Sequence, residues 1–258
     1  MKLLLKIAVI VVYLITQWNA SESLAASDAE QTTRYNEAGA LYREGQFASA
    51  LHIYEELIRS GITNPDLFYN ASNAAYRIGS LGKAILYIER ALKLAPSDRD
   101  ALANLAYLNS IKKDQESEDS NVVLTFLTQR YNSVNVNSAA IWSGVMFVCA
   151  TLIATGALFV RKWKRMALIA VSSLCGLICI ISTVIWLHKV HYNSTVVEAV
   201  IMTEEALAYS GPGDENTHIF TIHEGTKVTI ERAQDSWNLI RLNSGAGGWI
   251  KNDSMERI

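Results

Sequence analysis

Charged residues are scarce in this chain, and neither sign dominates. Only 19% of its 258 residues are Asp, Glu, Lys or Arg, whereas 50% are hydrophobic, and the formal net charge is -2. This composition is more apolar than that of a typical soluble protein and predicts that part of the chain lies in lipid. Nucleic-acid binding requires a basic stripe, so the charge balance predicts no nucleic-acid partner.

Cysteine is also rare, and each of the three cysteines falls inside an apolar run. Cys149, Cys175 and Cys179 are therefore excluded from an extracellular disulfide framework. Cys175 and Cys179 share a helix face, which would suit a metal or redox pair. No histidine or carboxylate lies beside them in the sequence, so we interpret them as small packing residues.

The chain lacks the short motifs that carry catalysis. It has no His-Glu-x-x-His, nucleophile elbow or glycine-rich phosphate loop, and its five histidines are scattered. His188 and His191 share a helix face, and we interpret them as interfacial anchors rather than haem or metal ligands. The adjacent Glu204 and Glu205 are interpreted as solvated charge. We predict no enzymatic activity, no cofactor and no metal site.

Residues 1–26 have the pattern of a secretory signal peptide. Lys2 and Lys6 come first, an apolar stretch covers residues 7–15, and small and polar residues come after it. The apolar stretch is shorter than the roughly 20 residues that cross a bilayer. We expect cleavage between Ala20 and Ala26. The alternative is an uncleaved anchor, and both versions export the segment that begins at about residue 28.

Residues 139–160 and 166–187 contain no charged residue. At 1.5 Å per residue each run reaches about 33 Å, which is enough to cross the hydrocarbon core of a membrane. We predict two transmembrane helices.

Residues 161–165 form a basic loop between these runs. Four of its five residues are cations: Arg161, Lys162, Lys164 and Arg165. The positive-inside rule places such a loop in the cytoplasm, so the segments before residue 139 and after residue 187 both face outward. We interpret the cations as an orientation signal rather than as a site for anionic lipid.

Residues 28–116 contain a repeat with a constant offset. Residues 45–51 align with residues 79–85, and every aligned pair lies 34 positions apart. This is the tetratricopeptide period, in which each unit is a pair of antiparallel helices. Small residues would let these helices approach closely, and larger residues would fill the seam between them. The small residues are Ala38, Ala50, Ser72 and Ala84, and the larger ones are Phe47, Tyr54, Leu81 and Ile88.

The turns and the end of the repeat carry their own signals. Gly45 and Gly79 lie where the first helix of each pair ends, and glycine there permits the left-handed conformation. Residues 98–113 have apolar residues at helical spacing, with Ser97 or Asp98 as the N-cap, and we interpret them as a capping helix.

The first helices of tetratricopeptide pairs line a groove that binds a peptide or a partner helix, and the resemblance implies the same use here. Tyrosine is enriched at interfaces, which favours partner binding, although the same tyrosines would also suit packing between helices. The predicted groove residues are Tyr35, Tyr42, Tyr69, Asn70, Asn73, Tyr76, Arg77, Asn104 and Tyr107.

Residues 117–138 are predicted to link the repeat to the membrane. The first part is acidic and polar, and residues 122–137 are interpreted either as a helix on the membrane surface or as an irregular tether.

Residues 192–258 contain short β-type runs separated by glycine-rich turns. The runs are residues 196–202, 207–209, 218–222, 226–232, 237–242 and 248–251. Many short strands of this kind predict a small closed all-β barrel. The order Ser210-Gly211-Pro212, Trp237 and Gly248-Trp249 resembles the bacterial SH3-like domain. We expect Trp249 in the core, and Tyr209 and Trp237 at the edge of a ligand groove.

The order of modules resembles a whole-chain family. Residues 82–87, 90–92 and 94–96 look like the tetratricopeptide membrane proteins of the Bacteroides aerotolerance (Bat) operon. The resemblance implies an inner-membrane scaffold whose N- and C-terminal domains face the periplasm. It also implies work with von Willebrand A-domain membrane proteins and a MoxR-type ATPase, and a role in oxidative-stress tolerance. The alternative function is a cell-envelope receptor that binds peptidoglycan or a wall peptide through the barrel.

Overall fold

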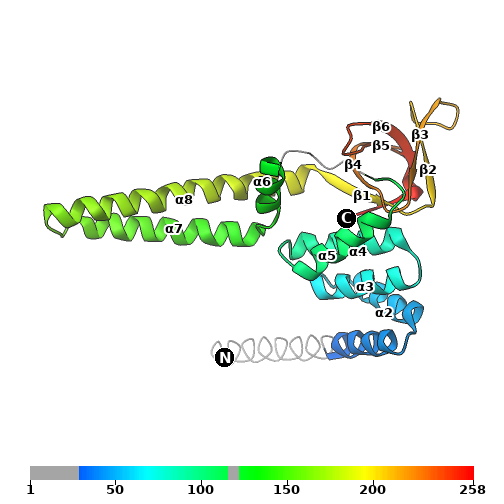
Figure 1. Cartoon of the computed structure of the whole chain (residues 1–258), viewed down its shortest axis with the longest axis horizontal. Coiled ribbons are helices and arrows are strands. Elements are labelled where there is room, and N and C mark those ends of the chain that lie inside the picture. The colour runs from blue at the N-terminus through cyan, green and yellow to red at the C-terminus, as the bar shows by residue number, and fades with distance from the viewer. Residues whose placement is uncertain (1–28, 116–121) are drawn as a thin grey trace, which may run out of the picture. The chain divides into compact units, whose positions relative to one another are not determined.

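The computed structural model describes residues 29–115 and 122–258, which form two compact units divided between Ser80 and Leu81. The predicted signal peptide and the acidic start of the predicted linker lie outside the described residues. The chain is mainly helical before residue 196 and forms an antiparallel sheet after it (Figure 1).

The described part of the first unit consists of helices joined by short turns. Residues 29–43 are helical and are followed by α2 (Phe47–Arg59) and α3 (Pro65–Arg77). The helix that ends at residue 43 and α3 both close on a glycine in the left-handed conformation, with φ of 81° at Gly45 and 82° at Gly79. The same backbone hydrogen bond closes each turn: the Gln46 amide donates to the Leu41 carbonyl, and the Ser80 amide donates to the Ala75 carbonyl. The predicted glycine turns are confirmed.

Two further helices open the second unit. They are α4 (Leu81–Leu94) and α5 (Arg99–Ile111). The Asp98 side chain caps α5 by accepting hydrogen bonds from the amides of its second and third residues. Asn64, 34 positions earlier, caps α3 in the same way. The predicted small residues Ala38, Ala50, Ser72 and Ala84 are each no more than 1% exposed. The 34-residue offset is therefore visible in helix boundaries, caps and buried positions.

The next helices are α6 (Val122–Asn132), α7 (Val136–Ala157) and α8 (Lys162–Thr195). Residues 122–132 are thus helical rather than an irregular tether. The helices α7 and α8 lie side by side as an antiparallel hairpin (Figure 1). Side-chain hydroxyl groups form hydrogen bonds between the two helices, including one between Ser143 Oγ and Thr183 Oγ1 at 2.6 Å. Both helices are long and apolar enough to cross a membrane.

The predicted basic loop over residues 161–165 is wrong in its extent. Only Arg161 precedes α8, as its N-cap, and Lys162, Lys164 and Arg165 belong to the first two turns of the helix. Lysine and arginine are good helix formers, so nothing in this run prevents the helix from starting early. The reversal occupies residues 158–161 instead.

The C-terminal part is a seven-stranded antiparallel sheet with the order β3-β2-β6-β5-β4-β1-β7. The strands are β1 (Val197–Ile201), β2 (Glu205–Tyr209), β3 (His218–His223), β4 (Lys227–Gln234), β5 (Trp237–Arg241), β6 (Gly247–Lys251) and β7 (Met255–Arg257), with a short 3-10 helix, η1 (Asn252–Ser254), before β7. Six of them fall within two residues of the predicted runs, and β7 was not predicted.

The sheet curves around a single apolar core (Figure 1). Strands β1 to β6 all contribute to it, and its buried residues are Ala199, Ile201, Ala206, Ala208, Ile222, Val228, Ile240 and Ile250. A Cβ on Gly248 would lie 3.0 Å from the Cβ of Ala208, so a glycine there lets β6 pass close to β2.

Candidate functional site

Two of the predicted groove residues of the first unit bind each other. The side-chain amide of Asn70 on α3 donates to the Tyr35 hydroxyl at 2.7 Å, and the Tyr35 ring lies 5.9 Å from that of Tyr54. Burial, and then the negative charge of Asp66, raise the pKa of Tyr35. Burial, followed by the neighbouring Tyr35, raises the pKa of Tyr54 to about 12. Tyr35 and Asn70 therefore brace the helices as well as border the surface.

A second pair of predicted groove residues packs on Phe47. The Tyr42 ring meets the Phe47 ring edge-on at 5.1 Å, and the Arg77 guanidinium lies 3.9 Å from the centre of the same ring. A guanidinium so close to an aromatic face is a cation–π contact. Tyr42 and Arg77 thus hold the turn after residue 43 against the end of α3.

The remaining predicted groove residues differ in exposure. In the first unit, Tyr69 and Asn73 are half-buried and Tyr76 is 37% exposed. In the second unit, Asn104 is half-buried and Tyr107 on α5 is 52% exposed.

The second unit contains an extensive set of contacts between α4, the segment that follows α5, and the sheet. We call this set the α4–sheet joint, and its polar members are Gly82, Glu89, Arg90, Lys93, Asp114, Glu224, Thr226, Lys227, His223, Glu256 and the carbonyl groups of Arg257 and Ile258. Nothing in the sequence signalled it.

At the start of α4 the backbone of the helix touches the sheet. The Gly82 amide donates to Glu224 Oε1 at 2.7 Å, which places a carboxylate at a helix N-terminus, where negative charge is favourable. A Cβ on Gly82 would lie 2.8 Å from the Ile201 carbonyl oxygen. Gly225 has φ of 84°, and a Cβ there would lie 2.7 Å from Ile85 Cδ1. Glycine is needed on both sides of this contact.

Lys227 forms the centre of the joint. Its Nζ lies 3.0 Å from Glu89 on α4 and 3.2 Å from Glu198 on β1. Burial alone would lower the pKa of Lys227, but the two carboxylates, Glu89 first, raise it to about 12. A partly buried cation between two carboxylates is satisfied by charge and by hydrogen bonds.

Asp114, just after α5, accepts three hydrogen bonds from the sheet. They come from the His223 amide at 2.8 Å, His223 Nδ1 at 2.7 Å and Thr226 Oγ1 at 2.8 Å. Partial burial would raise the pKa of Asp114, but the hydrogen bonds from His223 and Thr226 outweigh it and lower that pKa. The carboxylate thereby ties the end of the helical segment to the turn between β3 and β4.

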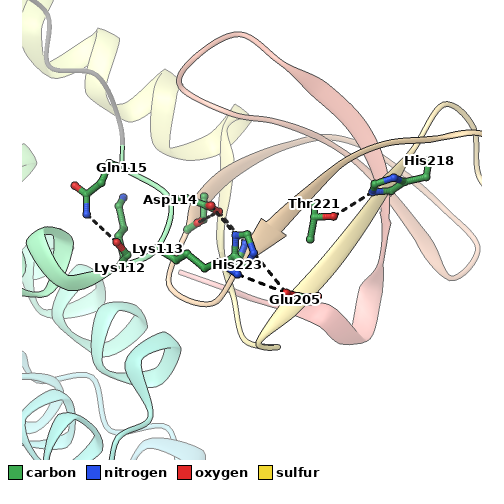
Figure 2. Close-up of polar contacts among 9 residues, drawn as sticks. Lys112, Lys113, Asp114, Gln115, Glu205, His218, Thr221 and His223 are labelled. Carbon is green, nitrogen blue, oxygen red and sulfur yellow. Dashed lines mark hydrogen bonds and ion pairs between the residues drawn. The ribbon is translucent and has the colours of Figure 1, made fainter.

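Figure 2 shows Asp114 and Glu205 on either side of the His223 ring. Nε2 of His223 lies 3.7 Å from Glu205, which also lies 3.5 Å from Lys113 Nζ. Glu205 is thus an ion-pair partner and not simply a solvated charge, although its side chain is 58% exposed. An aspartate that orients a histidine resembles part of a catalytic triad. Here Nε2 faces a carboxylate rather than a hydroxyl or thiol nucleophile, so the array serves to connect two elements.

The two residues predicted to edge a ligand groove on the sheet contact each other. The Tyr209 and Trp237 rings meet edge-on at 5.5 Å, and Lys251 Nζ lies 5.5 Å from the Trp237 ring. Trp237 is only 8% exposed and offers a ligand little surface. Trp249 is equally buried, as expected for a core residue. Binding of a wall peptide at this place stays a prediction of the sequence.

The four predicted topology residues are exposed, with Arg161 at the end of the turn between α7 and α8, and Lys162, Lys164 and Arg165 in the first two turns of α8. Across the described ranges 29–115 and 122–258, no three His, Cys, Asp or Glu side chains are arranged to hold a metal ion.

No protein-family model matches the chain, and no curated protein matches it either.

Proposed function

We propose that this chain is a membrane-anchored scaffold that binds other proteins through its repeat helices. In this proposal α7 and α8 cross the membrane as a hairpin, and the repeat helices and the sheet are displayed together on the outer side. The scaffold belongs to an envelope complex of the Bat type, whose membrane partners carry von Willebrand A domains.

The α4–sheet joint is the observation that carries the proposal. Residues 81–115 precede α7 and residues 197–258 follow α8, yet the two segments share the contacts of Asp114, Lys227 and Glu224. Such contacts require both segments to lie on one side of a membrane. Two crossings return the chain to the side from which it started, so the joint supports a hairpin rather than a single crossing.

The surfaces of α7 and α8 support insertion into lipid. Large apolar side chains point outward along both helices, with Leu152 67% exposed and Ile180 63% exposed. Water would make this exposure costly, whereas lipid tails match it. The cations at the α7–α8 turn favour a cytoplasmic position for that turn, which leaves the joint outside.

A test of topology uses single cysteines in a chain whose three native cysteines are replaced by alanine. We expect Asp253→Cys on the sheet side to react with a membrane-impermeant maleimide in intact spheroplasts. Lys164→Cys at the turn should react only after lysis. Labelling of both sites, or of Lys164→Cys alone, would overturn the proposed orientation.

A test of partner binding places a photo-crosslinking phenylalanine analogue at Tyr76 or Tyr107. Ile219 on β3, which is 52% exposed, serves as the matched control. We expect both repeat positions to crosslink the same membrane protein in intact cells, and charge reversal at Tyr69 and Tyr76 to abolish that product. A product at Ile219 but at neither repeat position would contradict the proposed binding face.

A further inference from the structure

A cavity of about 620 Å³ lies in the second unit, where α7 begins and α8 leaves its apolar run. Side chains of α4, α5, α6, α8 and β1 line it. The lining that matters for a ligand consists of Leu92 and Lys93 on α4, Tyr131 on α6, and His188, Lys189 and Tyr192 on α8. The cavity therefore combines an apolar wall, aromatic rings and cations with two carboxylates, Glu89 and Glu198.

Among the described residues, Lys189 is a positioned cation with no ion-pair partner. Its Nζ lies 4.4 Å from the centre of the Tyr131 ring, and no carboxylate within the described ranges forms an ion pair with it. The two carboxylates of the lining, Glu89 and Glu198, are paired with Lys227. The Tyr131 hydroxyl bonds to His188 Nδ1 at 2.6 Å, which fixes the ring under the ammonium group. The site thus holds a positive charge in place and leaves its hydrogen-bonding capacity open.

The level of the cavity indicates the source of the anion. Lys189 lies two residues after the apolar run that ends at Leu187, which is about 3 Å further along the helix. Phosphate headgroups flank the hydrocarbon core at this level, and tyrosine rings favour the same zone. Phe126 and Leu127 on the neighbouring α6 are 59% and 57% exposed, as expected for a helix that meets lipid.

We infer that this cavity binds the phosphate of an anionic phospholipid, with Lys189 as the principal cation and Leu92 against the lipid's apolar part. Lysine is a common point-charge ligand for phosphate. The inference rests on the proposed function, because α8 must cross the membrane for a headgroup to reach Lys189. Free phosphate has the same chemistry, and the experiment must separate the two sources.

The experiment is native mass spectrometry of the full chain in a neutral detergent, titrated with phosphatidylglycerol, with a neutral diacylglycerol or with inorganic phosphate. The variants are Lys189→Gln, Lys189→Arg as the conservative rescue, and Lys164→Gln as a matched loss of charge at the opposite end of α8. We expect one phosphatidylglycerol per wild-type chain. A lysine near the headgroup level contributes roughly fivefold in affinity, so Lys189→Gln should weaken this binding about fivefold or more.

Lys164→Gln and Lys189→Arg should keep the wild-type affinity, and diacylglycerol should not bind. Unchanged phosphatidylglycerol binding by Lys189→Gln would overturn the inference, and so would inorganic phosphate that displaces the lipid at equal concentration. If Lys189→Gln does not fold, the wild-type chain alone decides: binding phosphatidylglycerol and diacylglycerol with equal affinity would overturn the inference. Carbonate extraction separates the two proposals, because a chain that stays in the membrane but shows no lipid preference refutes only the site.

Discussion

The repeat helices and the α4–sheet joint are stabilised by different kinds of contact. In residues 29–80, small buried residues such as Ala38 and Ala50 let helices meet, and buried Leu51 and Tyr54 fill the space. The joint relies instead on hydrogen bonds and ion pairs between segments more than 100 positions apart. Apolar packing tolerates small shifts of the helices. In the polar joint, each buried polar group needs its hydrogen-bond partner at the right distance, so the two segments must keep one arrangement.

The largest effect is expected from a cavity in the repeat. Leu51 is 3% exposed, so Leu51→Ala should lower the free energy of unfolding by about 2–5 kcal/mol. Hydrogen exchange measured by mass spectrometry should rise in α2 and stay unchanged in the sheet. Leu102→Ala, at a position 40% exposed, is the matched control and should cost less than about 1 kcal/mol. Faster exchange in β3 and β4 of Leu51→Ala would show that the two regions unfold together.

A clash in the joint should be the next largest effect. Gly225→Ala adds a Cβ 2.7 Å from Ile85 Cδ1 at a residue with positive φ, so we expect a loss of about 2–4 kcal/mol. Gly245 has φ of 89° and open space around it, so Gly245→Ala isolates the backbone term of about 1–2 kcal/mol. Thermal unfolding followed by circular dichroism measures both. Equal losses would mean that the Ile85 side chain moves aside without cost and that Gly225 is needed only for its backbone conformation.

A smaller effect, dependent on pH, is expected from Asp114. Its lowered pKa means that the contribution of this carboxylate to stability is fully present above its usual pKa of 3.8 and is lost as pH falls through the lowered value. Asp114→Asn should cost about 1–3 kcal/mol at neutral pH, because three hydrogen bonds to a charged group are weakened. Unfolding midpoints between pH 2 and 7 should fall less steeply in Asp114→Asn than in the wild type. Parallel curves would contradict this role.

The smallest effect is expected from an exposed pair outside both regions. Arg241 on β5 binds Glu231 on β4 through two hydrogen bonds, and both side chains are solvated. Exposed ion pairs contribute little because water and salt screen them. Glu231→Gln should leave the unfolding midpoint unchanged at 150 mM salt. A clear loss would show that polar contacts stabilise the sheet even where it faces solvent.

The parts of the fold that were predictable are those with local signals. Gly45 and Gly79 mark helix ends by their chemistry, and the 34-residue offset places α2 and α4. The strand β7 was missed because Met255–Arg257 is three residues long with a single apolar residue. It forms by pairing with β1, a contact that no local pattern encodes.

The candidate site was less predictable than the fold. Tyr42 and Arg77 were expected in a groove, and their packing on Phe47 depends on three-dimensional contacts between separate helices. The joint was not predicted at all, because Asp114 and His223 lie 109 positions apart and neither belongs to a motif. Trp237 was expected at a groove edge, but neighbouring Tyr209 and Lys251 cover it.

The bond from the Gly82 amide to Glu224 also dictates an order of assembly. It joins residues 142 positions apart, and both apolar helices are synthesised between them. At translation rates of about 5–20 residues per second, α4 waits on the order of 10 s for its capping carboxylate. During that time Leu81 and Ile85, which later contact Gly225, are open to other proteins. The α4–sheet joint is therefore completed only after both helices of the hairpin have been made.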